Sequence, residues 1–439
     1  MEKRLARWKR LYLSKGALLT LIKSTLSSLP TYYLSLFPLP VSIAHCIEKL
    51  QRDFLWGGVG DEHKFHLVNW KQVCSPIPHG GLGYIRNMLL FNKALLGKRL
   101  WRYVSEIDSL WRRVVYCKYG SQRRGWFSNL IREPYGVSLW KYIRAGWECF
   151  AKHLTFKVGD GTRIKFWMDS WCGDQPLQTR FPELFRLACV PDATVDNHLH
   201  FHDATHVWDI EFSRLFQDWE LEMGVSFMEF LYSLPIRRGT MDSMWWHPST
   251  KRIFEVRFCY SVLVQSTGTY FPSRSVWNSK VPSRVAFFIW TAALGRLLTT
   301  DNLRRQRIII LDWCCMCRLG GESVNHLLMH CSVAKELSNM ILNMFGVSWV
   351  MPRDVVDLLS CWSGKVGKDE AGAIWRAIPH CLMRYLWGER NARTFIGESR
   401  SMPDLKLHFL QSHFYWLKAS RIITFDSLTD MIDTYSFCI

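Results

Sequence analysis

The sequence predicts a mainly α-helical protein of the α+β class, with small β-hairpins in the middle of the chain. Two patterns support this. Apolar residues recur at intervals of three and four through both end regions, as on the buried face of a helix. They alternate with polar residues in two short segments, near residues 154–166 and 244–256. With 439 residues, of which 48% are hydrophobic, the chain can bury one or more cores, which excludes wholesale disorder.

The first hundred residues predict three helices separated by clear breaks. Apolar residues have helical spacing over 18–29, and Pro30 ends that segment. A second helix is expected over 43–54, and a third over 87–103 after the glycine-rich residues 80–83. The glycine-rich segment lacks the Lys-Ser/Thr ending of a phosphate-binding loop, so we do not expect it to bind phosphate.

The middle of the chain predicts two hairpins. Gly159-Asp160-Gly161 separates two alternating segments, and Asp-Gly between such segments is a strong hairpin signal. The second hairpin is expected within Met244–Val256, with its turn at residues 247–250.

Helical spacing returns after residue 258 and continues through 285–294, 300–307, 374–390 and 405–416. The sequence therefore suggests four parts. They are a basic helical region over 1–125, a connecting region with two β-hairpins over 126–270, a small helical module over 271–345 and a helical C-terminal tail over 346–439.

Positive charge is concentrated at the N-terminal end. The whole chain has a formal charge of +18, and residues 1–170 alone carry 28 basic and 11 acidic side chains, a net charge of +17. Such a basic region predicts a polyanionic partner, RNA or DNA, bound without sequence preference. A solvated basic face that serves solubility is the alternative. The candidate phosphate contacts are Lys93, Lys98, Arg99, Arg102, Arg304, Arg305 and Arg307.

No secretory or membrane segment is expected. The longest apolar run, Val285–Leu294, is far too short to span a bilayer, and Lys15 interrupts the hydrophobic stretch near the N-terminus. We therefore expect an intracellular protein of the nucleus or cytoplasm, without a membrane partner, in which most of the 14 cysteines are reduced thiols. The 22 tryptophans could serve as buried core or as stacking faces.

Four residues have the spacing of a zinc site. Cys314, Cys317, His326 and Cys331 form the pattern C-x2-C-x8-H-x4-C. A Cys-x2-Cys knuckle presents two sulfurs to one ion, and three thiolates with one imidazole complete a closed, structural tetrahedral site. Cys315 and His330 lie beside these residues and could replace one of them. The alternative is a set of buried thiols without metal.

Several motifs carry a family resemblance. They are Leu26–Pro30, Arg52–Gly58, Gly80–Gly83, Phe91–Leu96, Gly159–Gly161, Phe166–Trp171, Trp277–Pro282, Phe288–Thr291, Leu298–Leu303 and Glu389–Phe395. In these motifs the chain resembles the post-polymerase part of plant LINE-type (non-LTR) retrotransposon polyproteins, including the reverse-transcriptase zinc-binding domain. The resemblance implies that residues 1–125 are a post-polymerase region similar to a thumb or connection, that residues 271–345 are the zinc-binding domain, and that one structural Zn²⁺ lies at the four residues of the spacing pattern. Residues 15–17 and 255–260 match the family pattern only loosely.

Catalytic motifs of such polyproteins are not found. A polymerase needs clustered carboxylates that hold two metal ions, and the chain contains no adjacent Asp-Asp pair. We also find no match to ribonuclease H or endonuclease motifs. The sequence therefore predicts a non-catalytic, retrotransposon-derived zinc-binding protein that contacts RNA or DNA, with retroelement proteins in trans as further partners. Two alternatives stay open: a protein-interaction scaffold, and a pseudogene product without present activity.

Overall fold

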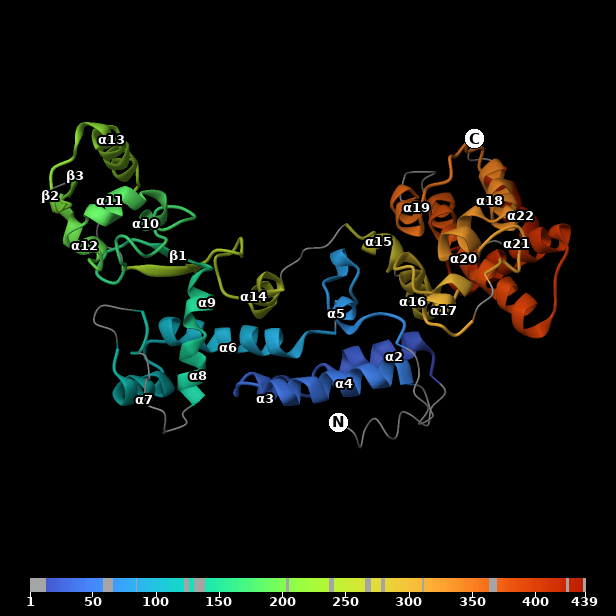
Figure 1. Ribbon diagram of the computed structural model, residues 1–439, viewed down its shortest axis with the longest axis horizontal. Coiled ribbons are helices and arrows are strands. Elements are labelled where there is room, and N and C mark those ends of the chain that lie inside the picture. The colour runs from blue at the N-terminus through green and yellow to red at the C-terminus, as the bar shows by residue number, and fades with distance from the viewer. Residues whose placement is uncertain are drawn as a thin grey trace. The chain divides into compact units, whose positions relative to one another are not determined.

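The structure is a computed structural model that divides into two compact units (Figure 1). It describes residues 13–57, 66–83, 85–121, 126–129, 139–202, 205–236, 241–264, 270–277, 281–309, 312–362, 369–423 and 426–436. Unit 1 comprises Met1–Pro30, His45–Asn87 and Ser266–Ile439, and unit 2 comprises Thr31–Ala44 and Met88–Gln265. Both units therefore combine segments that are distant in the sequence. The boundaries of the four predicted parts stay predictions.

In the described part of unit 1, all regular secondary structure is helical. Its elements are α2 (Lys15–Leu21), the π-helical turn η1 (Ile22–Leu26), most of α4 (Val41–Gly57), α5 (Trp70–Val73), the 3₁₀ turn η2 (Ile77–His79), α15 (Ser273–Val276), α16 (Ser283–Ala293), α17 (Thr300–Arg305), the π-helical turn η3 (His326–His330), α18 (Ser332–Met344), α19 (Val355–Cys361), α20 (Asp369–Asn391), the π-helical turn η4 (Ala392–Ile396), α21 (Met402–Ala419) and α22 (Leu428–Ser436).

Helix α16 forms the centre of the unit 1 core. Every residue from Val285 to Ala292 is buried, as expected of a helix that is apolar on all sides. It contacts α2 and α20, and α20 in turn contacts α21. The indole N–H of Trp290 donates to the carbonyl of Gly80 at 2.8 Å. The glycine-rich segment therefore packs on the core helix.

The same segment shows why glycine is required there. A Cβ atom at Gly81 would lie 1.7 Å from the carbonyl oxygen of Ser75, and Gly80 and Gly83 have φ values of 77° and 68°. Only glycine has room for the first contact and adopts the other two conformations at little cost. These glycines thus serve a tight backbone turn.

Unit 2 combines helices with two small antiparallel sheets. Its helices are α3 (Thr31–Leu34), α6 (Met88–Ser105), α7 (Leu110–Tyr119), α8 (Leu139–Ala145), α9 (Trp147–Ala151), α10 (Leu177–Arg180), α11 (Pro182–Leu187), α12 (Val195–His198), α13 (Asp218–Tyr232) and α14 (Val256–Leu263). Its strands are β1 (Leu154–Lys157), β2 (Leu199–His202), β3 (Thr205–Trp208) and β4 (Ser243–Trp246). The mainly helical fold class with small β-structures is confirmed.

The strand pairing differs from the predicted hairpins. Strand β1 does not return through residues 159–161 to a neighbouring strand, but pairs antiparallel with β4, with Leu154 opposite Trp246. The cause is the buried carboxylate of Asp242, which accepts the backbone N–H groups of Gly159 at 2.7 Å, Gly161 at 2.9 Å and Arg163 at 2.9 Å. These donors are therefore not available to a hairpin ladder.

The second predicted hairpin does not form either, because its second strand is replaced by a turn and a helix. After β4 the chain turns, with the backbone N–H of Trp246 bonded to the carbonyl of Arg252 at 3.0 Å, but the following residues enter α14 and not a second strand. The hairpin that does form, β2 with β3, was not predicted. Both alternating segments were thus correctly assigned as containing a strand, but their partners were wrong.

Aromatic rings fill the core of unit 2. The rings of Trp167 and Phe227 stack at a centroid distance of 5.5 Å and an interplanar angle of 4°. Phe166 contacts both, and Trp246 packs between Phe150 and Phe254. Most of this core comes from short elements and loops, which large rings can cover with few residues.

Among the described residues, no helix is both long enough and apolar enough to span a bilayer.

Candidate metal centre

The structure brings together the four residues of the zinc-like spacing pattern. One possible ligand atom from each of Cys314, Cys317, His326 and Cys331 lies within 4.8 Å of all the others. The Sγ atoms of Cys314 and Cys331 are 4.0 Å apart, and Cys317 Sγ is 3.3 Å from His326 Nε2. Around a tetrahedral zinc ion with Zn–S bonds near 2.3 Å, neighbouring sulfurs lie about 3.8 Å apart. The residues present therefore fit a single zinc ion.

Local backbone geometry positions the Cys314–Cys317 knuckle. The backbone N–H of Cys314 donates to the carbonyl of Gly320 at 2.7 Å, and the N–H of Arg318 donates to the carbonyl of Cys314 at 2.8 Å. Arg318 has a φ of 58°, a left-handed conformation that reverses the chain after the knuckle. The two sulfurs are thereby presented on the same side of a tight turn.

The other two residues lie at the ends of η3. His326 begins this π-helical turn, and Cys331 follows it directly and precedes α18. The backbone N–H of Cys331 donates to the carbonyl of His326 at 2.6 Å. A π-helical turn adds one residue to an α-helical turn, a device common at functional sites.

The cysteines of the cluster differ in their protonation tendencies: the hydrogen bond that the Cys314 thiol donates to Cys331, and then burial, raise the pKa of Cys314. A hydrogen bond from the Cys314 thiol, and then the backbone N–H groups of Val333 and Ala334, lower the pKa of Cys331. Burial lowers the pKa of His326, which keeps its imidazole neutral. Metal ligation requires thiolates and a neutral imidazole.

The two residues that could have replaced a ligand lie elsewhere. Cys315 Sγ is 3.8 Å from the carbonyl oxygen of Arg390 and accepts the Thr394 hydroxyl at 3.5 Å. His330 Nε2 is 3.0 Å from the carbonyl oxygen of Arg353. Neither side chain is part of the four-residue group.

A buried ion pair fastens the cluster region to the end of α20. Arg390 Nη2 is 2.8 Å from Glu322 Oε1, and the two side chains are 4% and 1% exposed. Glu322 also accepts a hydrogen bond from the backbone N–H of Thr300 at 3.1 Å, so the same carboxylate also contacts the first residue of α17. Glu322 lies four residues before His326, so this pair holds the segment that leads into η3.

A second network reaches the knuckle itself. Glu389 accepts hydrogen bonds from Arg393 Nε at 2.9 Å and Arg400 Nη1 at 2.7 Å. Arg393 in turn donates to the carbonyl of Met316, between the two knuckle cysteines, at 3.1 Å. The cluster is therefore supported by residues well beyond the Cys/His segment.

Sequence reasoning missed these supporting residues. Glu389 and Arg393 have the i,i+4 spacing of a helical ion pair, a signal that was available. Glu322 and Arg390 are 68 residues apart, and no local pattern links them. The segment Glu389–Phe395 was noted only for its family resemblance.

The predicted phosphate contacts have different surroundings in the two units. On α6 of unit 2, Lys93 and Lys98 are exposed. On the same helix, Arg99 Nε donates to the carbonyl of Ser35 at 3.4 Å, and Arg102 is held by Glu106 at 2.5 and 2.9 Å.

Three further candidates lie near the metal cluster in unit 1. Arg304 pairs with Asp312, and Arg305 is 3.7 Å from Asp301. Arg307 is exposed. Within the part of the chain that the structure describes, Lys93, Lys98 and Arg307 make no hydrogen bond or ion pair through their side chains.

Comparisons with known proteins agree with this site. A family described as zinc-binding in reverse transcriptase matches residues 254–337, which include all four cluster residues. The chain is 30% identical over 342 residues to the "Putative ribonuclease H protein At1g65750" of Arabidopsis thaliana, a match that covers 75% of this chain and 53% of the relative. It is 28% identical over 152 residues to the "Uncharacterized mitochondrial protein AtMg00310" of the same plant, covering 34% of this chain and 95% of that protein. No solved structure matches the chain.

The match to the first relative spans about half of that protein's length. The chain contains a reverse-transcriptase zinc-binding domain over residues 254–337, and these comparisons support an origin in a retrotransposon reverse transcriptase.

Proposed function

We propose that this chain is a non-catalytic part of a LINE-type reverse-transcriptase polyprotein, and that it contacts RNA or DNA without sequence preference. In this proposal Cys314, Cys317, His326 and Cys331 hold one structural zinc ion. The observation that carries the proposal is the convergence of these four residues within 4.8 Å.

A structural role for the ion follows from the number of ligands. Catalytic zinc keeps one coordination position open for water or substrate, whereas four protein ligands fill a tetrahedral ion. Three sulfurs and one imidazole nitrogen leave no such position. The ion would therefore stabilise the fold of the knuckle and η3, and it would activate no water molecule.

The proposal of no catalysis also rests on the carboxylates. Polymerase chemistry uses clustered acids that hold two metal ions. The chain has no adjacent Asp-Asp pair. Buried acids have structural partners: Asp242 binds three backbone N–H groups, and Glu322 and Glu389 bind arginines. The name of the first relative mentions ribonuclease H. An assay for cleavage of the RNA strand in an RNA–DNA hybrid decides whether the purified chain has that activity.

Nucleic-acid contact is supported by unpaired positive charge. Lys93, Lys98 and Arg307 are exposed, and within the described residues no acidic side chain neutralises them. Such cations can displace counterions from a phosphate backbone, which gives affinity without sequence information. Arg102 and Arg304, which are already paired with acids, should contribute less.

Binding of the full zinc-loaded chain to a random RNA 40-mer tests this part. Fluorescence anisotropy between 50 and 200 mM salt should show a steep loss of affinity. The triple variant Lys93→Ala, Lys98→Ala, Arg307→Ala should bind several-fold more weakly, with a salt slope lower by about one for each lost phosphate contact.

A matched control removes three cations that are paired with acids. These are Arg186, Arg257 and Lys406, which lie near Glu183, Glu255 and Glu336. Their replacement by alanine changes the net charge by the same amount and should leave affinity within about twofold of wild type. Equal losses in both triple variants would show that only total charge matters. No salt-sensitive binding by the folded wild type would overturn the nucleic-acid part.

One observation favours the second candidate, a protein-interaction scaffold. On one face of α13 in unit 2, at helical spacing, the side chains of Leu221, Val225 and Tyr232 are 50%, 57% and 47% exposed. Exposed apolar side chains that cluster are typical of contact surfaces. A folded, zinc-loaded chain that binds no RNA or DNA at low salt would favour this reading over the first.

A further inference from the structure

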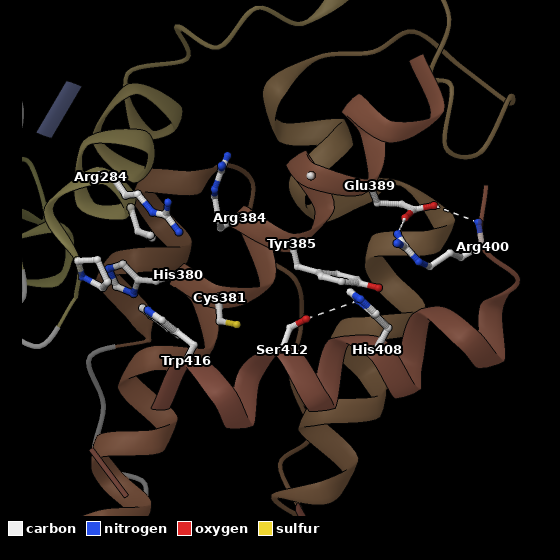
Figure 2. Close-up of a pocket in the computed structure, with 13 residues that line it drawn as sticks. Arg284, His380, Cys381, Arg384, Tyr385, Glu389, Arg400, His408, Ser412 and Trp416 are labelled. Carbon is white, nitrogen blue, oxygen red and sulfur yellow. Dashed lines mark hydrogen bonds and ion pairs between the residues drawn. The ribbon is translucent and has the colours of Figure 1, made fainter. Parts of the chain in front are cut away.

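A cavity separate from the metal cluster lies in unit 1 among α16, α20 and α21 (Figure 2). Its volume is about 360 Å³, at the lower end of the range typical of small-molecule sites. None of the four cluster residues lines it. Its chemistry is set by arginines, one carboxylate and aromatic rings.

Two arginines at this cavity pair with no acidic side chain among the described residues. Arg284 comes from α16 and Arg384 from α20, and both are exposed. Within the described residues neither guanidinium makes a hydrogen bond or an ion pair, although that of Arg384 lies 5.6 Å from the ring centroid of Phe288. Burial, and then the positive charge of Arg284, lower the pKa of Arg384. Two cations that repel each other at one cavity favour an anionic ligand.

The carboxylate that lines the cavity does not compete for them. Glu389 is bound by Arg393 at 2.9 Å and by Arg400 at 2.7 Å. Figure 2 shows Glu389 turned toward Arg400, at the end of the view opposite Arg284. The charge of Glu389 is therefore already neutralised, and the Arg284 end of the cavity stays positive.

Aromatic side chains form part of the wall. Tyr385 on α20 and Trp416 on α21 both line the cavity. The hydroxyl of Tyr385 donates to the carbonyl of Leu405 at 3.2 Å, which fixes the orientation of its ring. An aromatic ring beside unpaired cations is the combination that binds single nucleotides in a strand, because the ring stacks on the base and the cations hold the phosphate.

We propose that this cavity binds one nucleotide unit, with its phosphate at Arg284 and Arg384 and its base against Trp416, because the ring of Tyr385 already packs against His408 and Phe409. The inference rests on the proposed contact with nucleic acid and gives it a defined site. A single-stranded segment could supply the nucleotide, and so could a free mononucleotide. The volume admits one nucleotide and excludes a duplex.

The test uses the full zinc-loaded chain with four probes: uridine monophosphate, uridine, inorganic phosphate and an eight-residue oligouridylate. Calorimetry should show that the monophosphate binds at least tenfold more tightly than uridine or phosphate alone. The double variant Arg284→Ala, Arg384→Ala should lose at least tenfold in affinity for the monophosphate. Arg384→Lys, which keeps a charge, should lose less than Arg384→Ala.

A matched double variant, Arg353→Ala with Lys406→Ala, removes the same charge elsewhere in unit 1, and should bind the monophosphate within twofold of wild type. Zinc content and melting temperature equal to wild type would show that both double variants fold. Ultraviolet crosslinking of the oligouridylate should then label the peptide that contains Trp416.

The outcomes separate this inference from the proposed function. Equal binding of the monophosphate by wild type and the Arg284/Arg384 variant, or no binding by wild type, would overturn the site. If RNA binding nevertheless remained salt-sensitive, the proposed function would stand. Binding of the monophosphate without binding of oligouridylate or RNA would support the site for a free nucleotide and overturn the proposed contact with nucleic acid.

Discussion

The Cys/His cluster of unit 1 (Cys314, Cys317, His326 and Cys331) and the aromatic core of unit 2 both lie in parts of the chain with little regular secondary structure. They stabilise those parts in two different ways. The cluster region consists of short turns that are tied together by the Glu322–Arg390 ion pair and, in the proposed assignment, by four residues that hold one zinc ion. The core of unit 2 also joins short elements, but it does so with stacked rings such as Trp167 and Phe227. Both regions bury apolar side chains, Leu327 and Met329 among them in the cluster region, but that region adds cross-links between its turns, whereas unit 2 relies on large rings.

Cysteines illustrate the difference. Within the described residues, the one Cys/His/acidic group arranged to hold a metal lies in unit 1. In unit 2, Cys172 and Cys259 pack against the aromatic core as thiols, and burial raises the pKa of each to about 12. The same residue type thus serves as a candidate ligand in the cluster and as an apolar filler in unit 2, and also elsewhere in unit 1 at Cys74 and Cys381.

The largest expected effect is the loss of a cluster thiolate. Cys331→Ser should abolish stoichiometric zinc and unfold the knuckle and η3, because structural zinc typically contributes about 10–16 kcal/mol in small zinc modules. Hydrogen exchange should show lost protection over residues 312–331 and at the end of α20. Cys361→Ser, at an exposed cysteine of the same unit, should keep both zinc and protection. Full zinc content in Cys331→Ser would contradict the assignment.

In unit 2 we expect a large loss of stability without any loss of zinc. Trp167 is fully buried, so Trp167→Ala should cost about 3–5 kcal/mol of unfolding free energy through the cavity it leaves. Zinc content should not change. Denaturant unfolding with zinc analysis checks both points, and Trp219→Ala, at an exposed ring, should change stability by less than about 0.5 kcal/mol. Zinc loss in Trp167→Ala would break the contrast between the regions.

Removal of the buried carboxylate should have a smaller effect. Glu322→Gln leaves Arg390 charged and uncompensated, and should destabilise the cluster region by about 3 kcal/mol. Zinc affinity should fall, but the four ligands remain. The double variant Glu322→Met, Arg390→Met removes both charges and should recover much of the loss. A single variant as stable as wild type would show that the pair does not support the cluster.

The smallest effect is expected next to the knuckle. Cys315→Ser should leave zinc content nearly intact, because this side chain faces Arg390 and Thr394. Metal analysis of the purified protein checks this directly. A loss of zinc as complete as that of Cys331→Ser would place Cys315 among the ligands.

Local signals explain which features the sequence could predict. The helices over 43–54, 87–103 and 285–294 follow from spacing within one element, and α4, α6 and α16 are found there. The four cluster residues lie within one short segment, so their spacing was sufficient to group them. Strand partners were not predictable in this way, because Asp242 acts on Gly159 across 83 residues.

The residues that support the Cys/His cluster could not be predicted either, because their contacts are also distant in the sequence. Arg390 reaches Glu322 across 68 residues, and Arg393 reaches Met316 across 77. Neither contact leaves a pattern within one helix or loop. The cavity beside Arg284 and Arg384 also joins separate helices, and single-sequence periodicity contains no information about it.

The most direct test of the account is X-ray absorption spectroscopy at the zinc edge on the purified full chain, with metal analysis. The account predicts one zinc per chain, coordinated by three sulfurs near 2.3 Å and one nitrogen near 2.0–2.1 Å. It further predicts that Cys331→Ser loses this signal and that Cys315→Ser keeps it. A chain that is folded but contains no stoichiometric zinc, or a first shell that includes water, would contradict a closed structural site.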